Sequence, residues 1–189
     1  LNDLQNQMNF ISNITISDLN VFGSKVGNLS LKVDNENLEQ LNADVQLSGF
    51  DNDLKIKGFY NLKQSAFNLN VDVNKLQMKS LEGFSMKMIE ETEGFISGNL
   101  KVKGNLDKPS ILGDLKFNQV GLHVNSLNAT FKNIDDKIVF NDKGLQFSRF
   151  KINDTDGNSL VINGKVLTET YSDFKFDLTA DQSRAIVQI

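Results

Sequence analysis

The sequence predicts an all-β protein that forms one continuous body, because three observations agree. Apolar residues occupy every second position over long stretches, as they do in strands with one buried face. Turn signals return roughly every 8–12 residues, which favours an antiparallel meander over alternating strands and helices. Glycines also fall in the apolar phase of several strands, where they let a sheet bend, so we expect strong curvature. These glycines are Gly58, Gly98, Gly104 and Gly164.

The clearest strand pattern lies in residues 94–113. Ile96, Leu100 and Val102 alternate with polar residues, so one face of this strand is apolar. Pro109 is the only proline of the chain. Because proline cannot donate a backbone hydrogen bond, we expect Pro109 at the start of the next strand.

The residues before this stretch carry the same pattern with less emphasis. Residues 9–33 alternate between glycine-containing breaks, which predicts short strands joined by turns. Residues 42–62 are typical of a hairpin, with turn chemistry at 49–53. A third strand is predicted at 67–73.

The segment 78–93 differs, and we predict one short amphipathic helix there. Its apolar residues recur at three- to four-residue steps, namely Leu81, Phe84, Met88 and Ile89. Ser80 is the candidate N-cap, and an acidic cluster ends the helix in solvent. The acidic cluster consists of Glu90, Glu91 and Glu93. We expect the apolar stripe to pack on the sheet, where the helix plugs an end or covers an edge.

The remaining chain returns to strand patterns separated by turns rich in Asn, Asp and Gly. The predicted strands are 122–124, 127–131, 137–140, 145–147, 150–152, 160–166 and 174–180.

Composition limits the classes of function. The chain has 189 residues, enough to bury a sizeable core, and carries a formal net charge of −4. This charge argues against nucleic-acid binding. The absence of cysteine excludes disulfides and thiolate metal sites. No run reaches transmembrane length and residues 1–30 lack a signal-peptide layout, so we expect any export signal or anchor to lie upstream.

Residues that could carry chemistry are few. His123 is the only histidine, which excludes any site that needs two histidines. Asp154, Asp156 and Asn158 resemble the start of a calcium-binding loop, but Ser159 stands where that loop requires glycine. A turn between strands fits these residues better. The sequence therefore predicts no enzyme, no metal site and no cofactor.

The aromatic residues allow two interpretations of the apolar face. The chain has fourteen Phe and no Trp, and many Phe fall in the apolar phase of predicted strands. They could fill the core of a sandwich. Alternatively, one curled sheet could leave its inner face open, so that the same residues line a channel for acyl chains.

Several short motifs occur in a characteristic order. They are Ser80-Leu81-Glu82-Gly83-Phe84-Ser85, Gly94-x-x-x-Gly98-Asn99-Leu100-x-Val102-x-Gly104, Pro109, Gly113-Asp114-Leu115, Leu127-Asn128, Phe131, Ile138-x-Phe140, Gly144-x-x-Phe147, Asp154-x-x-Gly157-Asn158-x-Leu160, Gly164 and Tyr171-x-x-Phe174-x-Phe176-x-Leu178. On these motifs, residues 81–180 resemble the C-terminal domain of TamB, an AsmA-like family of the bacterial envelope, and most closely the Bacteroidetes-type versions. The best match lies over 94–180, and residues 183–189 fit least.

The resemblance implies a β-taco, a long antiparallel sheet curled into a trough open on one side, over residues 1–189 of a larger envelope protein. It implies a periplasmic, non-enzymatic segment of a translocation and assembly module that is anchored in the inner membrane. The implied partners are phospholipid acyl chains and an outer-membrane protein of the TamA or BamA type, with membrane contact through the rest of the chain. The implied lining, assigned by strand phase, is Ile96, Leu100, Val102, Leu115, Phe117, Phe131, Phe140, Phe147, Ile162, Phe174, Phe176 and Leu178.

Three functions compete at this point. The trough could carry phospholipid between the inner and outer membranes and so support outer-membrane assembly. The sheet edges could instead bind nascent outer-membrane strands by strand addition. A filled sandwich of two packed layers would make the chain a plain binding domain.

Overall fold

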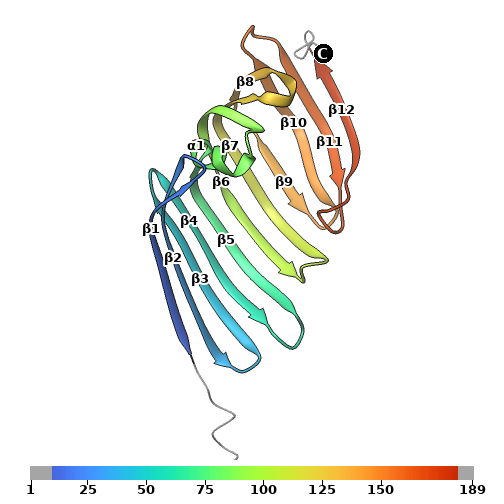
Figure 1. The fold of residues 1–189 in the computed structure, drawn as a ribbon. Helices are drawn as coiled ribbons and strands as arrows, with labels where there is room; N and C mark the ends of the chain where they lie inside the picture. The colour runs from blue at the N-terminus through green and yellow to red at the C-terminus, as the bar shows by residue number, and fades with distance from the viewer. Residues whose placement is uncertain (1–9, 183–189) are drawn as a thin grey trace, which may run out of the picture.

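The computed structural model describes residues 10–182, so the predictions for residues 1–9 and 183–189 lie outside the described part. Within residues 10–182 all twelve strands belong to one antiparallel sheet (Figure 1). The prediction of an all-β curled sheet is therefore confirmed. Because these strands form a single sheet, the alternative of a sandwich of two sheets does not describe this part of the chain.

In the described part of the chain, the sheet is interrupted by one α-helical turn and two short 3-10 helices. The strands are β1 (Ile11–Val21), β2 (Ser24–Asn37), β3 (Gln40–Gly49), β4 (Asn52–Asn61), β5 (Ala66–Gln77), β6 (Ile89–Gly104), β7 (Pro109–Val124), β8 (Ala129–Ile134), β9 (Lys137–Asn141), β10 (Gly144–Asp154), β11 (Ser159–Leu167) and β12 (Lys175–Gln182). The helical elements are α1 (Met78–Leu81), η1 (Glu82–Ser85) and η2 (Asn125–Leu127).

The strand order follows the chain almost throughout. Each strand from β1 to β7 pairs with the next, β8 pairs with β10, and β11 and β12 continue the sheet. β7 pairs with β9 along 113–116 and with β8 along 120–124, so the sheet forks at this strand. The predicted hairpin at 42–62 is β3 and β4, and Pro109 begins β7 as expected.

Some predicted strands are parts of longer ones. Residues 145–147 and 150–152 both belong to β10, which contains a bulge between Phe147 and Phe150. Arg149 in this bulge has a positive φ of 54°. A bulge shifts the side-chain alternation by one residue, so one strand looks like two in the sequence.

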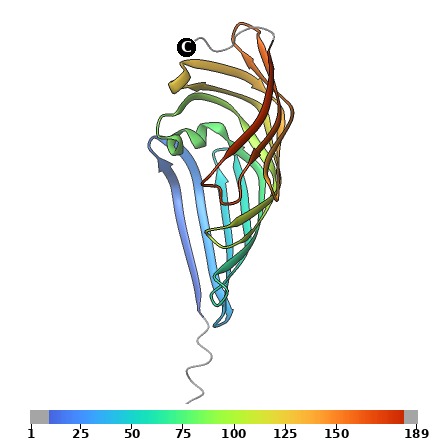
Figure 2. The same ribbon diagram turned by 90° about the vertical axis from the view of Figure 1, so that its right-hand side faces the viewer.

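The sheet is strongly curved, as Figure 2 shows from the side. Two glycines on the inner face of β6 and β7 explain part of this curvature. Gly98 has φ +146° and Gly113 has φ +134°, and an added Cβ at either residue would collide with a backbone carbonyl oxygen of the neighbouring strand. Only glycine allows this conformation and this close approach of strands.

The predicted helix at 78–93 is wrong in its extent. α1 and η1 end at Ser85, and β6 begins at Ile89. Between them Met86 and Lys87 both adopt positive φ, at 51° and 66°, which stops a right-handed helix and reverses the chain. The acidic residues therefore lie in a strand, where Glu90 pairs with His123 of β7.

The predicted N-cap and apolar stripe are also corrected. Gln77 occupies the N-cap position, whereas Ser80 lies inside α1 and is 2% exposed. Leu81 packs against the core, but Phe84 and Met88 are 55% and 65% exposed. The helix is too short to present three turns of one face, so the stripe does not form. α1 contacts β2, β5 and β6 where β2 begins and β5 ends, so of the two predicted positions it takes the end of the sheet and not its edge (Figure 1).

A closed core lies where α1 and β8 meet the inner face of the sheet. Its buried members are Met78, Val120, Phe131, Ile134 and Phe150. The ring of Phe150 makes edge-to-face contacts with Phe117 and Phe147, each with centroids 5.6 Å apart. This part of the inner face is filled by the protein itself.

Candidate functional site

One row of side chains crosses the sheet from β1 to β12 without a charged residue. Each member lies opposite the next in the strand register, so the side chains share the inner face. The row consists of Ile16, Leu29, Leu47, Leu54, Val73, Gly98, Leu115, Ile138, Phe147, Gly164 and Leu178.

A second row runs beside the first, two residues away along each strand. It consists of Ile14, Leu31, Val45, Ile56, Val71, Leu100, Gly113, Phe140, Leu145, Val166 and Phe176. We call the two rows together the inner apolar face. The alternation that a single strand shows in the sequence thus becomes a continuous apolar surface when the strands pair.

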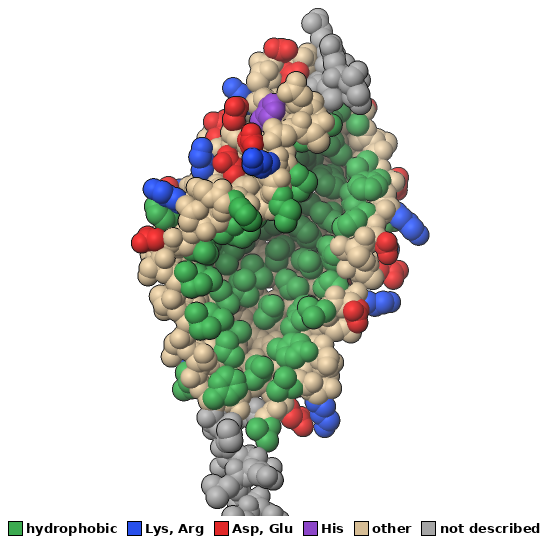
Figure 3. All heavy atoms as spheres, viewed as in Figure 1, with side chains coloured by type: hydrophobic (Ala, Val, Ile, Leu, Met, Phe, Trp, Pro, Cys, Tyr) green, Lys and Arg blue, Asp and Glu red, His purple; other side chains and the backbone are tan. Residues whose placement is uncertain are grey.

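The exposure of the inner apolar face varies along the sheet. At β1, Ile14 and Ile16 are 49% and 41% exposed, and at β12 Phe176 is 72% exposed. Most members between them are half-buried, and a few such as Val73 are buried. Figure 3 shows hydrophobic side chains gathered over a hollowed face of the molecule.

The opposite face of the sheet is polar. Lys57 of β4 and Asp44 of β3 form an ion pair across the strands, with Nζ and Oδ2 2.9 Å apart. The hydrogen bond from Lys57 is the main cause that lowers the pKa of the Asp44 carboxyl. Ion pairs of this kind lie in solvent and contribute little to stability. They mark this face as the one that meets water.

The predicted lining residues fall into three groups. Six lie in the two rows: Leu100, Leu115, Phe140, Phe147, Phe176 and Leu178. Val102 lies one step further along β6, opposite Ile111 and Leu69. The others lie at the closed core or outside the strands: Ile96, Phe117, Phe131, Ile162 and Phe174.

Two of these residues lie apart from the rows. Phe131 is 9% exposed because β8 folds into the closed core, so its ring packs against protein. Phe174 precedes β12 and is 46% exposed in the connection from β11. Strand phase alone does not reveal which apolar positions another segment covers.

The lining set predicted from the sequence omits the N-terminal half of the inner apolar face. These residues are Ile14, Ile16, Leu29, Leu31, Val45, Leu47, Leu54, Ile56, Val71 and Val73. These residues alternate in the sequence as the predicted lining does, but they lie outside residues 81–180, which carry the family motifs. The same strand-phase argument would have found them.

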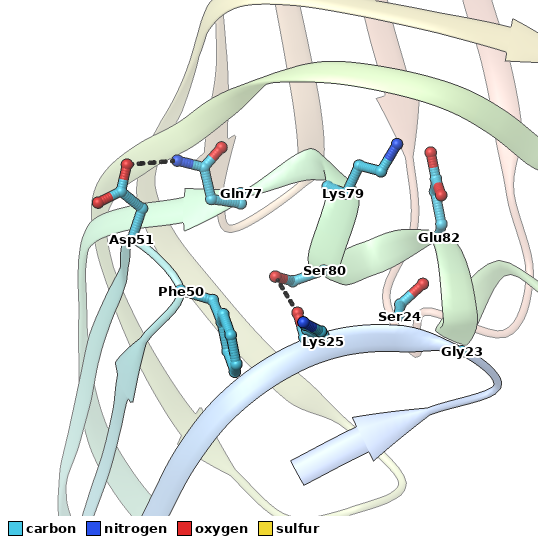
Figure 4. Close-up of a pocket in the computed structure, with 9 residues that line it drawn as sticks. All are labelled: Gly23, Ser24, Lys25, Phe50, Asp51, Gln77, Lys79, Ser80 and Glu82. Atoms are coloured by element: carbon cyan, nitrogen blue, oxygen red, sulfur yellow. Dashed lines mark hydrogen bonds between the residues drawn. The ribbon is translucent and has the colours of Figure 1, made fainter. Parts of the chain in front are cut away.

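A buried polar network fixes α1 to the ends of two strands beside a pocket of about 710 Å³ (Figure 4). The amide nitrogen of Asn52 donates to the Val26 carbonyl oxygen at 2.7 Å and to the Ser80 hydroxyl at 2.8 Å. The Ser80 hydroxyl donates to the Lys25 carbonyl oxygen at 2.8 Å. The backbone amide of Gln77 donates to the Asn52 side-chain oxygen at 2.7 Å. This network holds α1 over the inner face.

His123 and Asp154, the candidates for a catalytic or metal-binding role, form hydrogen bonds within the fold. Nδ1 of His123 lies 2.9 Å from the hydroxyl of Thr130 on the next strand. The carboxylate of Asp154 accepts hydrogen bonds from the amides of Asp156 and Asn158, which confirms the predicted turn. The side-chain hydrogen bond from Asn158 is the main cause that lowers the pKa of Asp154. Residues 10–182 contain no cluster of three or more side chains that could hold a metal ion.

In the described part of the chain, no helix is long and apolar enough to span a membrane.

Comparison with known proteins gives one match. The model of the TamB C-terminal domain family matches residues 51–149, which is 99 of the 189 residues. This range begins in the turn before β4 and ends in β10, so it includes α1, the fork at β7 and the middle of both apolar rows. We found no curated protein and no solved structure that matches the chain. Since the matched range covers more than half of its length, the chain belongs to the TamB C-terminal domain family.

Proposed function

We propose that the inner apolar face is an open trough that carries phospholipid acyl chains between the inner and outer membranes and thereby supports outer-membrane assembly. The TamB family consists of non-enzymatic envelope proteins with roles in envelope assembly and lipid transport. The continuous apolar rows are the observation on which the proposal depends. They offer a surface for acyl chains and no constellation of groups for catalysis.

The length of the rows suits this function. Neighbouring strands lie about 4.8 Å apart, so the ten steps from β1 to β12 span about 48 Å along the curved sheet. An acyl chain in a bilayer leaflet is about 15 Å long, half of the hydrocarbon core. The rows are therefore long enough for several chains in succession, as movement along a surface requires.

The distribution of polarity also suits a lipid. An acyl chain gains about 0.8 kcal/mol for each methylene group that leaves water, so an uncharged surface of this length binds it favourably. A headgroup can stay in water at the open side, because nothing in the rows pairs with a charge. We propose that the protein acts at the outer membrane with a partner of the TamA or BamA type and that its full length is anchored in the inner membrane.

Two adjacent residues of β6 test the trough directly. Leu100 belongs to the inner apolar face and is half-buried, whereas Lys101 lies on the polar face and is exposed. A photo-crosslinking residue at position 100 should capture phospholipid in cells, and one at position 101 should not. Equal capture at both positions, or none at position 100, would contradict the proposal. Mass spectrometry of protein from native extraction should also find bound phospholipid.

A second candidate function is strand addition at β1. Residues 11–17 carry no charge, whereas β12 has Lys175, Asp177 and Asp181 along its edge. Charged edge residues discourage pairing with other chains, so β1 is the better template for an added strand. A fluorescent peptide with the sequence of an outer-membrane β-signal should then bind and protect β1 amides from exchange. Absence of binding at high peptide concentration would exclude this candidate.

A further inference from the structure

Large apolar side chains project from one end of the strands, around α1. Phe22 is 90% exposed, Met86 is 83% exposed and Phe50 is 47% exposed. Phe84 and Met88, in the same segment as Met86, are 55% and 65% exposed. We call these five residues the α1 rim.

Three residues of the α1 rim, Phe22, Phe50 and Met86, belong to one surface. Phe50 lines the pocket beside α1 together with Lys25 and Lys79 (Figure 4). Phe22 and Met86 line a neighbouring pocket of about 420 Å³, and both pockets include Ser24 and Glu82. The turns from β1 to β2, from β3 to β4 and from η1 to β6 therefore meet at this end of the sheet.

The backbone of these turns makes the side chains unusual. Phe22, Phe50 and Met86 each have positive φ, at 47°, 46° and 51°, and a residue with positive φ follows each of them. Two-residue turns of this kind favour Asn, Asp or Gly at the first position, and a bulky residue there is strained. Turn formation does not account for these residues, and neither does burial, because they are exposed.

Charge around the α1 rim points to a partner with phosphate groups. Lys79 and Lys87 form no ion pair within residues 10–182, and the Nζ of Lys25 lies 5.3 Å from the centre of the Phe50 ring. Two nearby acids, Asp51 and Glu82, have partners within the protein.

Asp51 pairs with Lys75 at 3.1 Å, and the Glu82 carboxylate accepts hydrogen bonds from the amide and hydroxyl of Thr92 at 2.7 and 2.8 Å. Glu90 is the remaining exposed acid that lines these pockets. The bonds from the neutral Thr92 leave the negative charge of Glu82 in place. In the described part of the chain, three lysines therefore face two carboxylates without an ion pair, Glu82 and Glu90, beside the apolar tips.

We propose that the α1 rim docks on a phospholipid bilayer surface. The side chains of Phe22, Phe50 and Met86 enter the acyl layer, and the three lysines lie at the depth of the phosphates, as in amphipathic segments that rest at the membrane interface. A role in loading lipid onto the inner apolar face rests on the proposed function, whereas the docking itself does not.

Flotation of the full chain with vesicles tests this docking. The vesicles consist of equal parts phosphatidylcholine and phosphatidylglycerol. The double variant Phe22→Asn and Met86→Asn should have an affinity for the vesicles about 100-fold lower than the parent. Burial of one such side chain raises affinity by at least about tenfold. Asparagine suits positive φ, so this variant should keep the thermal midpoint of the parent.

Leu106→Asn is the matched control. Leu106 is 84% exposed in the turn between β6 and β7, at the other end of the strands, and its loss should leave flotation unchanged. Equal flotation of the parent and the double variant would overturn the proposal. So would equal losses in the double variant and the control.

Two further measurements separate the remaining explanations. The chain has no Trp, so Met86→Trp reports on this site alone. Its emission should shift to the blue with vesicles, while Leu106→Trp should not shift. Lys79→Gln with Lys87→Gln should weaken binding to the mixed vesicles more than to vesicles of phosphatidylcholine alone. If the parent does not float but forms dimers that the Phe22 and Met86 changes abolish, the rim is a contact between copies and the proposal is wrong.

The same variants distinguish docking from lipid carriage. Ile56→Asn lies on the inner apolar face and should lose bound phospholipid but still float. The Phe22 and Met86 double variant should show the reverse. Loss of flotation in Ile56→Asn, with lipid binding intact, would overturn the docking proposal while leaving the trough in place.

Discussion

Asn52 should be among the most costly polar residues to replace. Its side chain is 4% exposed, accepts a hydrogen bond from the Gln77 amide and donates one to the Val26 carbonyl oxygen, each at 2.7 Å. Asn52→Ala removes this partner from the buried Val26 carbonyl oxygen and from the partly buried Gln77 backbone amide. A buried polar group without a partner costs about 1–3 kcal/mol, so the free energy of unfolding should fall by about 2–6 kcal/mol. This is a large part of the usual total of about 5–15 kcal/mol.

Urea unfolding followed by circular dichroism measures this effect. Ser80→Ala removes one member of the network but leaves the Asn52 bonds to Val26 and Gln77, so it should cost less, about 1–3 kcal/mol. The two changes together should fall short of the sum of the single effects, because they share one network. Asn70→Ala, on the exposed face of β5, serves as the control and should stay within about 0.5 kcal/mol. If Asn52→Ala behaves like this control, the network does not hold α1 in place.

Four further predictions follow from burial, backbone conformation and ionisation. Phe150→Ala, in the closed core, should cost about 3–5 kcal/mol in urea unfolding, whereas Phe84→Ala, at an exposed position, should cost less than about 1 kcal/mol. Gly98→Ala should destabilise the fold strongly, because its Cβ collides with a neighbouring strand; a thermal midpoint equal to that of the parent would contradict this. The pKa of Asp154 is lowered in the folded state, so its stabilisation is present above the unfolded pKa of about 3.9 and is lost as pH falls through the folded value. Asp154→Asn should therefore show a smaller loss of urea midpoint in acid than the parent. Burial raises the pKa of Tyr171, and its hydroxyl has no hydrogen-bond partner in the described residues, so Tyr171→Phe should not destabilise the protein at neutral pH. It should also resist alkali better, since the Tyr171 contribution is present below about pH 10 and is lost as pH rises through the folded value.

Side-chain alternation was sufficient to predict the sheet and much of its inner face. Leu100, Phe140 and Phe176 were placed in the lining by strand phase, and the strand register puts all three in one row. This works because a strand has a period of two, so one correct residue determines the side of every other residue up to the next bulge. The register between strands, and hence the continuity of the rows, depends on pairing that a single strand pattern does not contain.

The segment after β5 could not be predicted in the same way. Leu81, Phe84 and Met88 have helical spacing, but pairing of Glu90 with His123 and the reversal at Met86 compete with that local pattern. The pairing of β6 with β5 and β7 prevails over the local helical pattern, because a strand between two neighbours satisfies its backbone groups along its whole length. The contact of Asn52 with Ser80 joins residues 28 positions apart, and no local rule predicts it.

The near-sequential strand order has a consequence for how such a protein can change in length. Most strands contact only their neighbours in the chain, so the sheet resembles a repeat array whose stability is close to a sum of local terms. Addition of a complete hairpin beside β1 would extend both apolar rows by two positions and leave every other pairing unchanged, whereas a hairpin between β3 and β4 would separate Val26 from Asn52 and Lys25 from Ser80. Insertion of a single strand would reverse the chain direction of all later strands and move α1 away from the strand ends that it now covers. Length should therefore vary at the β1 edge, whereas the strands from β2 to β10, which the buried network and the fork at β7 join, should keep a constant number.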